Sequence, residues 1–131
     1  MPANRQRSDA PAPREQLVLI FSPDAVAAVL LGGLVETLGY QVHFAHPPES
    51  ADDSVRRVKP RICLVDSSDP LSCRPEFFGH AAMRGVSVVI YGTPSTLDRV
   101  RELARAHDID TLIMPPELET LEAALQRAGD D

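Results

Sequence analysis

The sequence predicts an α/β fold, in which a parallel sheet lies between two layers of helices. Short apolar runs of strand length alternate along the chain with longer segments of helical periodicity. Residues 62–65 (ICLV) are continuously apolar, as expected of a strand that is buried on both faces. This run ends on Asp66 and a turn closed by Pro70, so a carboxylate lies at the strand end where open α/β sheets gather ligands.

The composition is that of a single globular domain. The chain has 131 residues, of which 44% are hydrophobic and 24% charged, enough to bury one core. Its net charge of −6 disfavours a phosphate backbone as partner, so we expect no nucleic-acid binding. The longest apolar run, residues 25–35, is too short to span a bilayer, so we expect no membrane partner. Cys63 and Cys73 lack metal-ligand spacing and are expected to be reduced thiols of a cytoplasmic protein.

Two segments divide the chain. Residues 1–15 are rich in proline, alanine and arginine without apolar periodicity, and we expect a disordered N-terminal tail there. The folded domain is expected over residues 16–128, beginning with a strand at residues 16–21 (QLVLIF). Ser22 is the expected N-cap of the next helix, because Pro23 suits the first helical position.

The first helix should turn one side toward the sheet. Apolar residues at intervals of four predict its core-facing stripe, namely Val26, Leu30, Leu34 and Leu38. Gly39 is placed to end the helix. Gly32 and Gly33 lie inside the helix rather than in a phosphate-binding loop, and they therefore predict close helix packing.

The alternation continues to the end of the chain. Further strands are predicted at residues 41–45, 62–65, 86–91 and 110–114, and further helices at residues 50–58, 76–83, from 95, and 117–127. Ser50 is the expected N-cap of the second helix, and Ser95 with Asp98 resembles a capping box for the fourth. The core-facing residues of the last two helices should be Leu97, Val100 and Ala104, and then Leu118, Leu121 and Leu125.

Five βα units in succession predict one parallel sheet, because right-handed crossovers place a helix between neighbouring parallel strands. The expected architecture is a flavodoxin-like (βα)5 three-layer sandwich with the strand order 2-1-3-4-5. The strand at residues 62–65 should then lie buried beside the first strand. The ligand crevice of such a sheet lies beside strands 1 and 3, where the sequence places Asp66.

Four stretches, in order along the chain, carry a resemblance to a known family. LVETLGYQVHFAHPPESA resembles the end of the family's first helix, its glycine and its second strand, and PRICLVDSSDP resembles its third strand with an aspartate and a proline. SVVIYGT resembles the fourth strand, and DTLIMPPELETLEAAL the fifth strand and last helix. Over residues 16–128 the chain therefore resembles a response-regulator receiver domain of bacterial two-component signalling and phosphorelay systems.

The resemblance implies transfer of a phosphoryl group to Asp66, which matches the family's phosphoacceptor. The family completes its pocket with two acids that hold magnesium, a Ser or Thr, and a Lys. In this sequence those positions fall, in the same order, on Phe21 and Ser22, on Gly92 with Thr93 one residue later, and on Met114 before Pro115. Only the acceptor keeps the family's residue type.

These departures predict an atypical, pseudo-receiver-like domain. Magnesium and a lysine neutralise the charge that gathers when a phosphoryl group reaches a carboxylate, and Phe21 and Met114 supply neither. We expect a non-enzymatic signalling protein that has no cofactor or metal and acts through protein contacts. The alternative is a phosphorylatable stand-alone response regulator with Asp66 as acceptor and magnesium bound, where Asp24 or Asp69 would replace the missing acids. Asp66 could equally cap a neighbouring turn.

A histidine kinase or another signalling protein is the expected partner. A homodimer through the fourth and fifth helices is also predicted, since opposite charges on neighbouring helices suit a two-fold contact. The residues concerned are Arg99, Arg101 and Arg105 on one helix and Glu117, Glu119 and Glu122 on the other. The alternative is that both faces are simply solvated, because exposed ion pairs contribute little.

Overall fold

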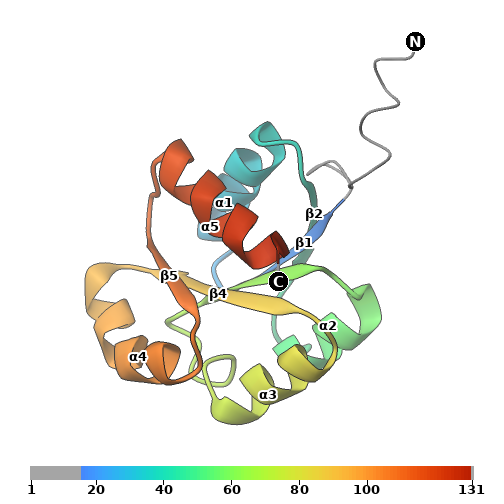
Figure 1. The fold of residues 1–131 in the computed structure, drawn as a ribbon, viewed down its shortest axis with the longest axis vertical. Coiled ribbons are helices and arrows are strands. Elements are labelled where there is room, and N and C mark those ends of the chain that lie inside the picture. Colours follow the sequence, from blue (N-terminus) through green and yellow to red (C-terminus); the bar gives the residue numbers. More distant parts are fainter. Residues whose placement is uncertain (1–15, 131) are drawn as a thin grey trace.

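The computed structural model describes residues 16–130, in which five strands alternate with five helices (Figure 1). The strands are β1 (Leu17–Phe21), β2 (Gln41–Ala45), β3 (Ile62–Asp66), β4 (Ser87–Gly92) and β5 (Asp110–Ile113). The helices are α1 (Ala25–Thr37), α2 (Ala51–Val58), α3 (Pro75–Met83), α4 (Pro94–Ala106) and α5 (Leu118–Asp130). The tail expected at residues 1–15 lies outside the described residues. Within residues 16–130, no helix is long and apolar enough to cross a membrane.

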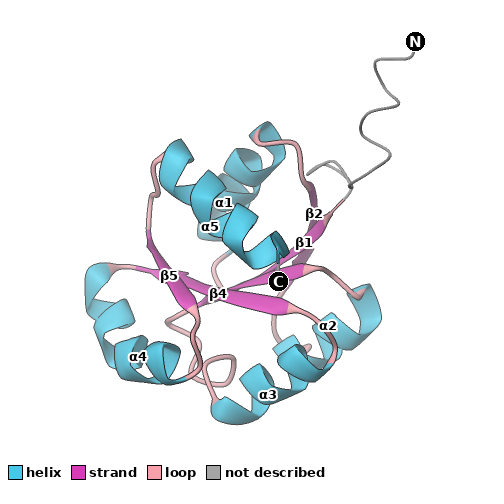
Figure 2. Cartoon of the chain, viewed as in Figure 1, coloured by secondary structure: helices cyan, strands magenta, loops and turns pink. Residues whose placement is uncertain are grey.

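The strands form one parallel sheet in the order β2-β1-β3-β4-β5, which confirms the predicted topology. β1 lies beside β3, with Val18 opposite Ile62 and Phe21 opposite Val65. Figure 2 shows α1 and α5 on one face of the sheet and α2, α3 and α4 on the other. The three-layer sandwich is therefore present, and the carboxyl ends of all five strands meet at one edge.

The core is divided by the sheet into two clusters. Alternate residues of each strand enter the cluster under α2, α3 and α4 or the cluster under α1 and α5. In β3, the four apolar side chains at positions 62–65 have no exposed surface at all. This burial on both faces explains why the segment reads as a continuous apolar run, and it confirms the prediction for Val65.

The first helix begins later than the sequence suggested. Asp24, and not Ser22, is its N-cap: the Asp24 Oδ1 accepts hydrogen bonds from the backbone N–H groups of Val26 and Ala27, at 3.0 and 3.2 Å. Ser22 is buried and uses its hydroxyl elsewhere, at the carboxyl edge of the sheet. Both residues are good caps by type, so only the path of the chain decides between them.

The predicted core stripe of α1 was wrong for its first half. Val26 and Leu30 are exposed, whereas the residues that face the sheet are Ala28, Leu31, Gly32 and Val35. Leu34 and Leu38 pack at the margin of the core. The periodicity could not locate the inner face because nearly every residue of this helix is apolar. Close packing decides it, and a Cβ on Gly32 would lie 2.5 Å from the Phe44 ring.

The remaining glycine and capping predictions had mixed outcomes. Gly39 has a φ of 99°, which confirms its place at the end of α1, and Ser50 caps α2 as expected. Gly33, in contrast, is exposed, and a Cβ there would meet nothing within 4 Å, so the close packing expected at Gly33 is absent. Leu118 is half-exposed at the start of α5, while the other predicted core residues of α4 and α5 are buried.

The fourth helix also starts at a different cap. Thr93 is the N-cap of α4, and its capping box is closed by Thr96 rather than formed by Ser95 and Asp98. Pro94 occupies the first helical turn, a position that suits proline because its missing N–H would have no helical partner there. The N-termini of α1 and α4 thus both lie at the carboxyl edge of the sheet, next to the end of β3.

Candidate functional site

The carboxyl edge of the sheet brings together the residues that the sequence singled out. Asp66 is the last residue of β3, Ser22 directly follows β1, and Gly92 is the last residue of β4. Since β3 lies between β1 and β4, these three positions are neighbours. Asp66 is only 7% exposed, so its carboxylate depends on protein groups for its hydrogen bonds.

Both carboxylate oxygens of Asp66 accept hydrogen bonds from neutral donors. The Ser22 hydroxyl donates to Oδ2 at 2.9 Å. The backbone N–H and the hydroxyl of Ser68 donate to Oδ1 at 2.9 and 2.8 Å, which closes an Asx-type turn directly after the strand. Asp66 therefore joins the loop after β1 to the loop after β3, and its charge is stabilised by hydroxyl and amide dipoles.

The two positions that would hold a metal are used for other purposes. Phe21 is 1% exposed and packs in the cluster under α2, α3 and α4, so its ring is part of the core. Ser22 is also buried, and besides its bond to Asp66 its Oγ accepts from the backbone N–H of Asp24 at 3.0 Å. Neither residue offers a carboxylate to a cation.

The two acids considered as replacements also accept hydrogen bonds from groups of the chain itself. The Asp24 carboxylate caps α1, and the Asp69 carboxylate accepts from the Ser72 hydroxyl at 2.6 Å and from the Leu71 backbone at 3.3 Å. Within residues 16–130, no three His, Cys, Asp or Glu side chains gather in a metal-binding arrangement. Magnesium prefers several oxygen ligands in octahedral geometry. The residues at this edge therefore do not fit the ion that the resemblance implies.

At Gly92, a hydroxyl reaches the site from the turn after β3. A Cβ on Gly92 would lie 1.9 Å from the Ser67 Oγ and 2.7 Å from the Thr96 Oγ1. The Ser67 hydroxyl donates to Thr96 Oγ1 at 2.7 Å, so this pair fills the space beside Gly92. Thr93 is exposed and occupied in capping α4. A side chain at position 92 would have to displace Ser67.

The last pocket position carries no cation. Met114 is half-buried against the cluster under α1 and α5, and its backbone N–H donates to the Gly92 carbonyl at 2.9 Å. Pro115 follows through a cis peptide bond. The family's lysine position is thus part of the packing that joins the ends of β4 and β5.

Sequence reasoning assigned Tyr91 to packing, which its burial confirms, but missed its place opposite Asp66 in the sheet. Its ring is 1% exposed, and its hydroxyl has no hydrogen-bond partner within the described part of the chain. Burial raises the pKa of this phenol, the nearby Ser22 hydroxyl lowers it by a smaller amount, and the charges of Asp66 and Asp24 raise it further, so the phenol stays neutral. Ser67, Ser68 and Thr96 were missed as well. The serines directly after the strand were the available signal, because such residues form side-chain turns.

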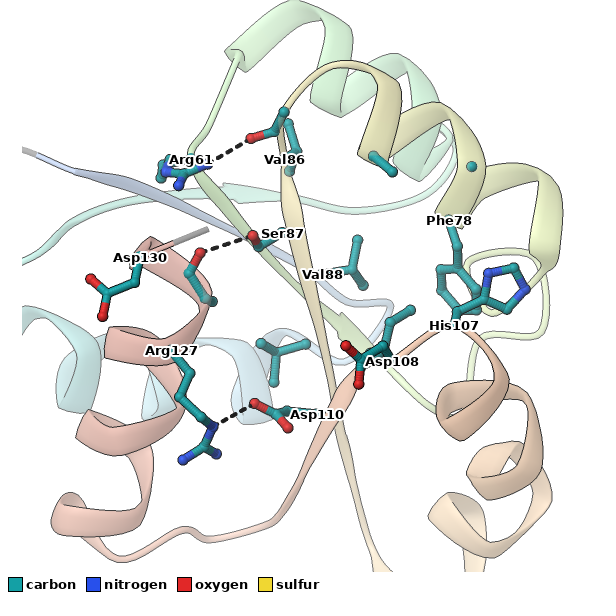
Figure 3. A pocket seen from close by; sticks show the side chains of 16 residues that line it. Arg61, Phe78, Val86, Ser87, Val88, His107, Asp108, Asp110, Arg127 and Asp130 are labelled. Atoms are coloured by element: carbon teal, nitrogen blue, oxygen red, sulfur yellow. Dashed lines mark hydrogen bonds and ion pairs between the residues drawn. The ribbon is translucent and has the colours of Figure 1, made fainter.

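A hollow of about 870 Å³ opens at the opposite edge of the sheet (Figure 3). Its polar groups are largely paired with one another. Arg127 binds the Asp110 carboxylate at 2.9 Å, and the Ser87 hydroxyl donates to a backbone carbonyl of α5 at 2.8 Å. We regard this open groove as a weaker candidate, because it gathers no set of convergent free polar groups.

The cysteines offer no reactive thiol to either edge of the sheet, although the Cys73 thiol donates a weak hydrogen bond to the backbone carbonyl of Asp66 at 3.8 Å. Cys63 and Cys73 are buried and unpaired, as expected. Burial, together with the charges of Asp69 and Asp66, raises the pKa of the Cys73 thiol to about 12, and burial raises that of Cys63 as well. Both thiols are therefore protonated and unreactive near neutral pH.

The comparisons with known proteins agree with the topology. Neither a protein-family model nor a curated protein matches the sequence. Among solved structures, a protein from Burkholderia pseudomallei described as pilus assembly-related is 21% identical, with a TM-score of 0.72 over 92% of this chain and 94% of that one. A response-regulator receiver domain protein from Clostridium thermocellum is 15% identical, with a TM-score of 0.67 over 88% and 94%.

The chemotaxis response regulator CheY4 of Vibrio cholerae is also similar, at 17% identity and a TM-score of 0.62 over 86% of this chain and 98% of that one. Matches of this kind cover nearly all of the described residues and nearly all of each receiver domain. Identities this low establish architecture and leave the chemistry open. The described part of this chain has the fold of response-regulator receiver domains.

Proposed function

We propose that this protein is a receiver-like signalling module that works through contacts with other proteins, without magnesium-dependent phosphorylation of Asp66. The observation that carries this proposal is the closed hydrogen bonding of the Asp66 carboxylate, which engages Ser22 and Ser68 through both oxygens. The protein would be a cytoplasmic, non-enzymatic member of a signalling pathway. Its partner would be a histidine kinase or another signalling protein.

The energetic argument concerns charge. A phosphoryl group on Asp66 would bring negative oxygens to an edge where the carboxylate is bound by neutral groups, the hydroxyls of Ser22 and Ser68 and the backbone N–H of Ser68. The missing metal and lysine contacts are together worth at least a few kcal/mol, which is about a hundredfold or more in occupancy. The modification would also break the bond between Asp66 and Ser22, which joins two loops.

The second candidate function is phosphorylation of Asp66 in a pocket of unusual composition. It is favoured by the position of Asp66, which ends β3 at the carboxyl edge, and by the hydroxyls of Ser67 and Thr96 beside Gly92. These two hydroxyls could take the part that the resemblance gives to a Ser or Thr at position 92. Magnesium would then need ligands from water and from the donor of the phosphoryl group.

Mass spectrometry of the intact protein separates the two candidates. The wild type is incubated with a small phosphodonor and magnesium, beside a phosphorylatable receiver domain as positive control. We expect no labelling of the wild type. Labelling on Asp66 at the level of the positive control, lost in Asp66→Asn, would overturn the proposal.

A restored pocket sharpens this experiment. The variant combines Phe21→Asp, Ser22→Asp, Gly92→Thr and Met114→Lys, and it also needs Ser67→Gly because Ser67 Oγ occupies the space of a side chain at 92. Since Phe21 is a core residue, the same set without Phe21→Asp is tested in parallel. We expect at least one folded variant to label more than the wild type.

A contact between two copies through α4 and α5 stays a prediction. Arg99, Arg101 and Arg105 are exposed, as are the three glutamates at 117, 119 and 122, although Glu117 precedes α5. Arg101 already pairs with Asp98 on its own helix at 3.1 Å. Sedimentation at low and high salt tests this contact, because association through exposed charges weakens as salt rises.

A further inference from the structure

The outward face of α1 is apolar. Val26, Val29 and Leu30 are 71%, 62% and 64% exposed, and the exposed Gly33 follows on the same side. The other large exposed apolar side chains on α3, β5, α5 and the loop after β3 lie singly and need no explanation. Three within five consecutive positions of one helix form a patch, and contiguous apolar patches mark interaction sites.

The patch results from a helix that is apolar all round. Residues 25–35 contain no charged and no hydrogen-bonding side chain, yet the sheet covers only one side of α1. A surface helix normally carries polar residues on its outer side, and a helix without them is normally buried. In a single chain, the outward side of α1 therefore stays exposed to solvent, although its residues are of the types that are normally buried.

Strand β2 extends the patch. Phe44, half-exposed on this edge strand, packs over Gly32 and lines a hollow of about 280 Å³ that Val29 also lines. The hollow is bounded mainly by apolar groups from the start of α1 and the end of β2. The apolar surface thus continues from the middle of α1 to the edge of the sheet.

We propose that the outward face of α1, defined by Val26, Val29, Leu30 and Gly33, joins two copies of this chain. The surface has no charge to recognise a charged partner, so its complement must be equally apolar. A second copy offers that complement. Two antiparallel α1 helices related by a two-fold axis near positions 29 and 30 place each large Val26 against the small Gly33 of the other copy. At the axis, Val29 of each copy then lies against Leu30 of the other.

Gly33 supports this arrangement independently. Glycine weakens a helix relative to alanine, so a mid-helix glycine lowers stability unless a close contact uses its missing side chain. For Gly32 that contact lies inside the chain, because the Phe44 ring packs against it. A Cβ on Gly33, however, would meet nothing within 4 Å. A close approach from a second copy supplies the contact that the single chain lacks.

The size of the surface sets the expected strength. Stable interfaces bury about 800 Å² on each partner, and weak ones bury less. The four residues of the α1 face are fewer than the roughly 20–30 residues that each partner contributes to a standard interface, and Phe44 with its hollow adds to them. We therefore expect a dimer that dissociates in the micromolar range. This contact uses neither Asp66 nor the α4–α5 surface, so it stands or falls separately from the proposed function.

Sedimentation velocity over a range of protein concentrations tests the proposal. We expect the wild type to change from monomer to dimer, and the dimer to persist in high salt because the contact is apolar. Leu30→Glu should remove the dimer. Met83→Glu is the matched control, since Met83 is also an exposed apolar helix residue, 87% exposed on α3, and this variant should still dimerise. A wild type that is monomeric at every concentration would overturn the proposal.

A second variant avoids any question of folding. Gly33→Gln fills empty space and favours the helix, so the monomer should be at least as stable as the wild type, while the dimer should weaken at least tenfold.

Cross-linking then tests the register. Val26→Cys and Gly33→Cys proteins, mixed with oxidised glutathione, should join to each other much faster than Val26→Cys joins to Met83→Cys. Equal rates would contradict the antiparallel contact.

Discussion

Helices α1 and α4 have the same length and opposite outer surfaces. Each has 13 residues and packs a row of small and branched residues against the sheet, from opposite faces. The outer side of α4 carries Arg99, Arg101 and Arg105, whereas that of α1 carries Val26, Val29 and Leu30. The fold requires only that the inner side of each helix pack against the sheet. The outer sides are free to differ, and their chemistry therefore reports on what each helix contacts.

The N-termini of the two helices are, in contrast, held in similar ways. Ser22, just before α1, is bound to Asp66, and Thr96, in the first turn of α4, is bound to Ser67. Consecutive residues at the end of β3 thus fasten the two helices to the same loop. Polar groups that a receiver pocket could offer to a phosphoryl group are used here to connect the elements around it.

The largest expected effect separates the inner from the outer side of α1. Leu31→Ala should lower the free energy of unfolding by about 2–5 kcal/mol, because Leu31 is fully buried and its truncation leaves a cavity. Leu97→Ala in α4 should cost a similar amount. Leu30→Ala should change it by less than about 0.5 kcal/mol. Urea denaturation, at a protein concentration that keeps the chain monomeric, measures all three. Equal losses for Leu30→Ala and Leu31→Ala would show that the assignment of the inner face is wrong.

The next effect concerns the fastening of α1. Asp66→Ala should cost about 1–3 kcal/mol, because it removes the acceptor of the buried Ser22 hydroxyl and of the two Ser68 donors. Asp66→Asn should cost much less, since its amide can donate to the Ser22 Oγ while its carbonyl keeps the Ser68 bonds. Denaturant unfolding of the two variants side by side provides the test. A loss as large for Asn as for Ala would mean that the negative charge itself is required.

The caps of the two helices should contribute comparably. Asp24→Ala removes an acceptor of two backbone N–H groups of α1, and Thr93→Ala removes the capping box of α4. Each should cost about 1 kcal/mol. Ser95→Ala is the control, because Ser95 lies inside α4 and is not its cap. Thermal unfolding measures these losses. A larger loss of stability for Ser95→Ala than for Thr93→Ala would show that Thr93 is not the N-cap of α4.

The smallest effect on stability should come from the outer side of α4. Replacing Arg99, Arg101 and Arg105 by Gln should change the free energy of unfolding by no more than about 0.5 kcal/mol, because exposed charges contribute little. The dimer through α1 should also survive this change. If sedimentation instead shows that the dimer is lost at low salt, the contact runs through α4 and α5, and the comparison between the two helices is reversed.

The sequence by itself determined the architecture. Alternating apolar runs and helical segments, with β-branched residues in the strands, require a parallel sheet with helices on both faces, and crossover handedness then limits the order of strands. The buried strand β3 and the position of Asp66 at its end followed from a single apolar run. These features depend on local residue types and on periodicity, and the amino-acid sequence alone contains both.

Only the tertiary structure decided which side of α1 faces the sheet and what surrounds Asp66. A helix that is apolar on every side over residues 25–35 has no polar side to identify the outer face, so the close approach of Phe44 to Gly32 selects it. The donors to Asp66 come from Ser22 and Ser68, and the space beside Gly92 is filled by Ser67. Residues 22 and 66 are far apart in the chain, and their contact exists only because parallel pairing brings the carboxyl ends of β1 and β3 to the same edge.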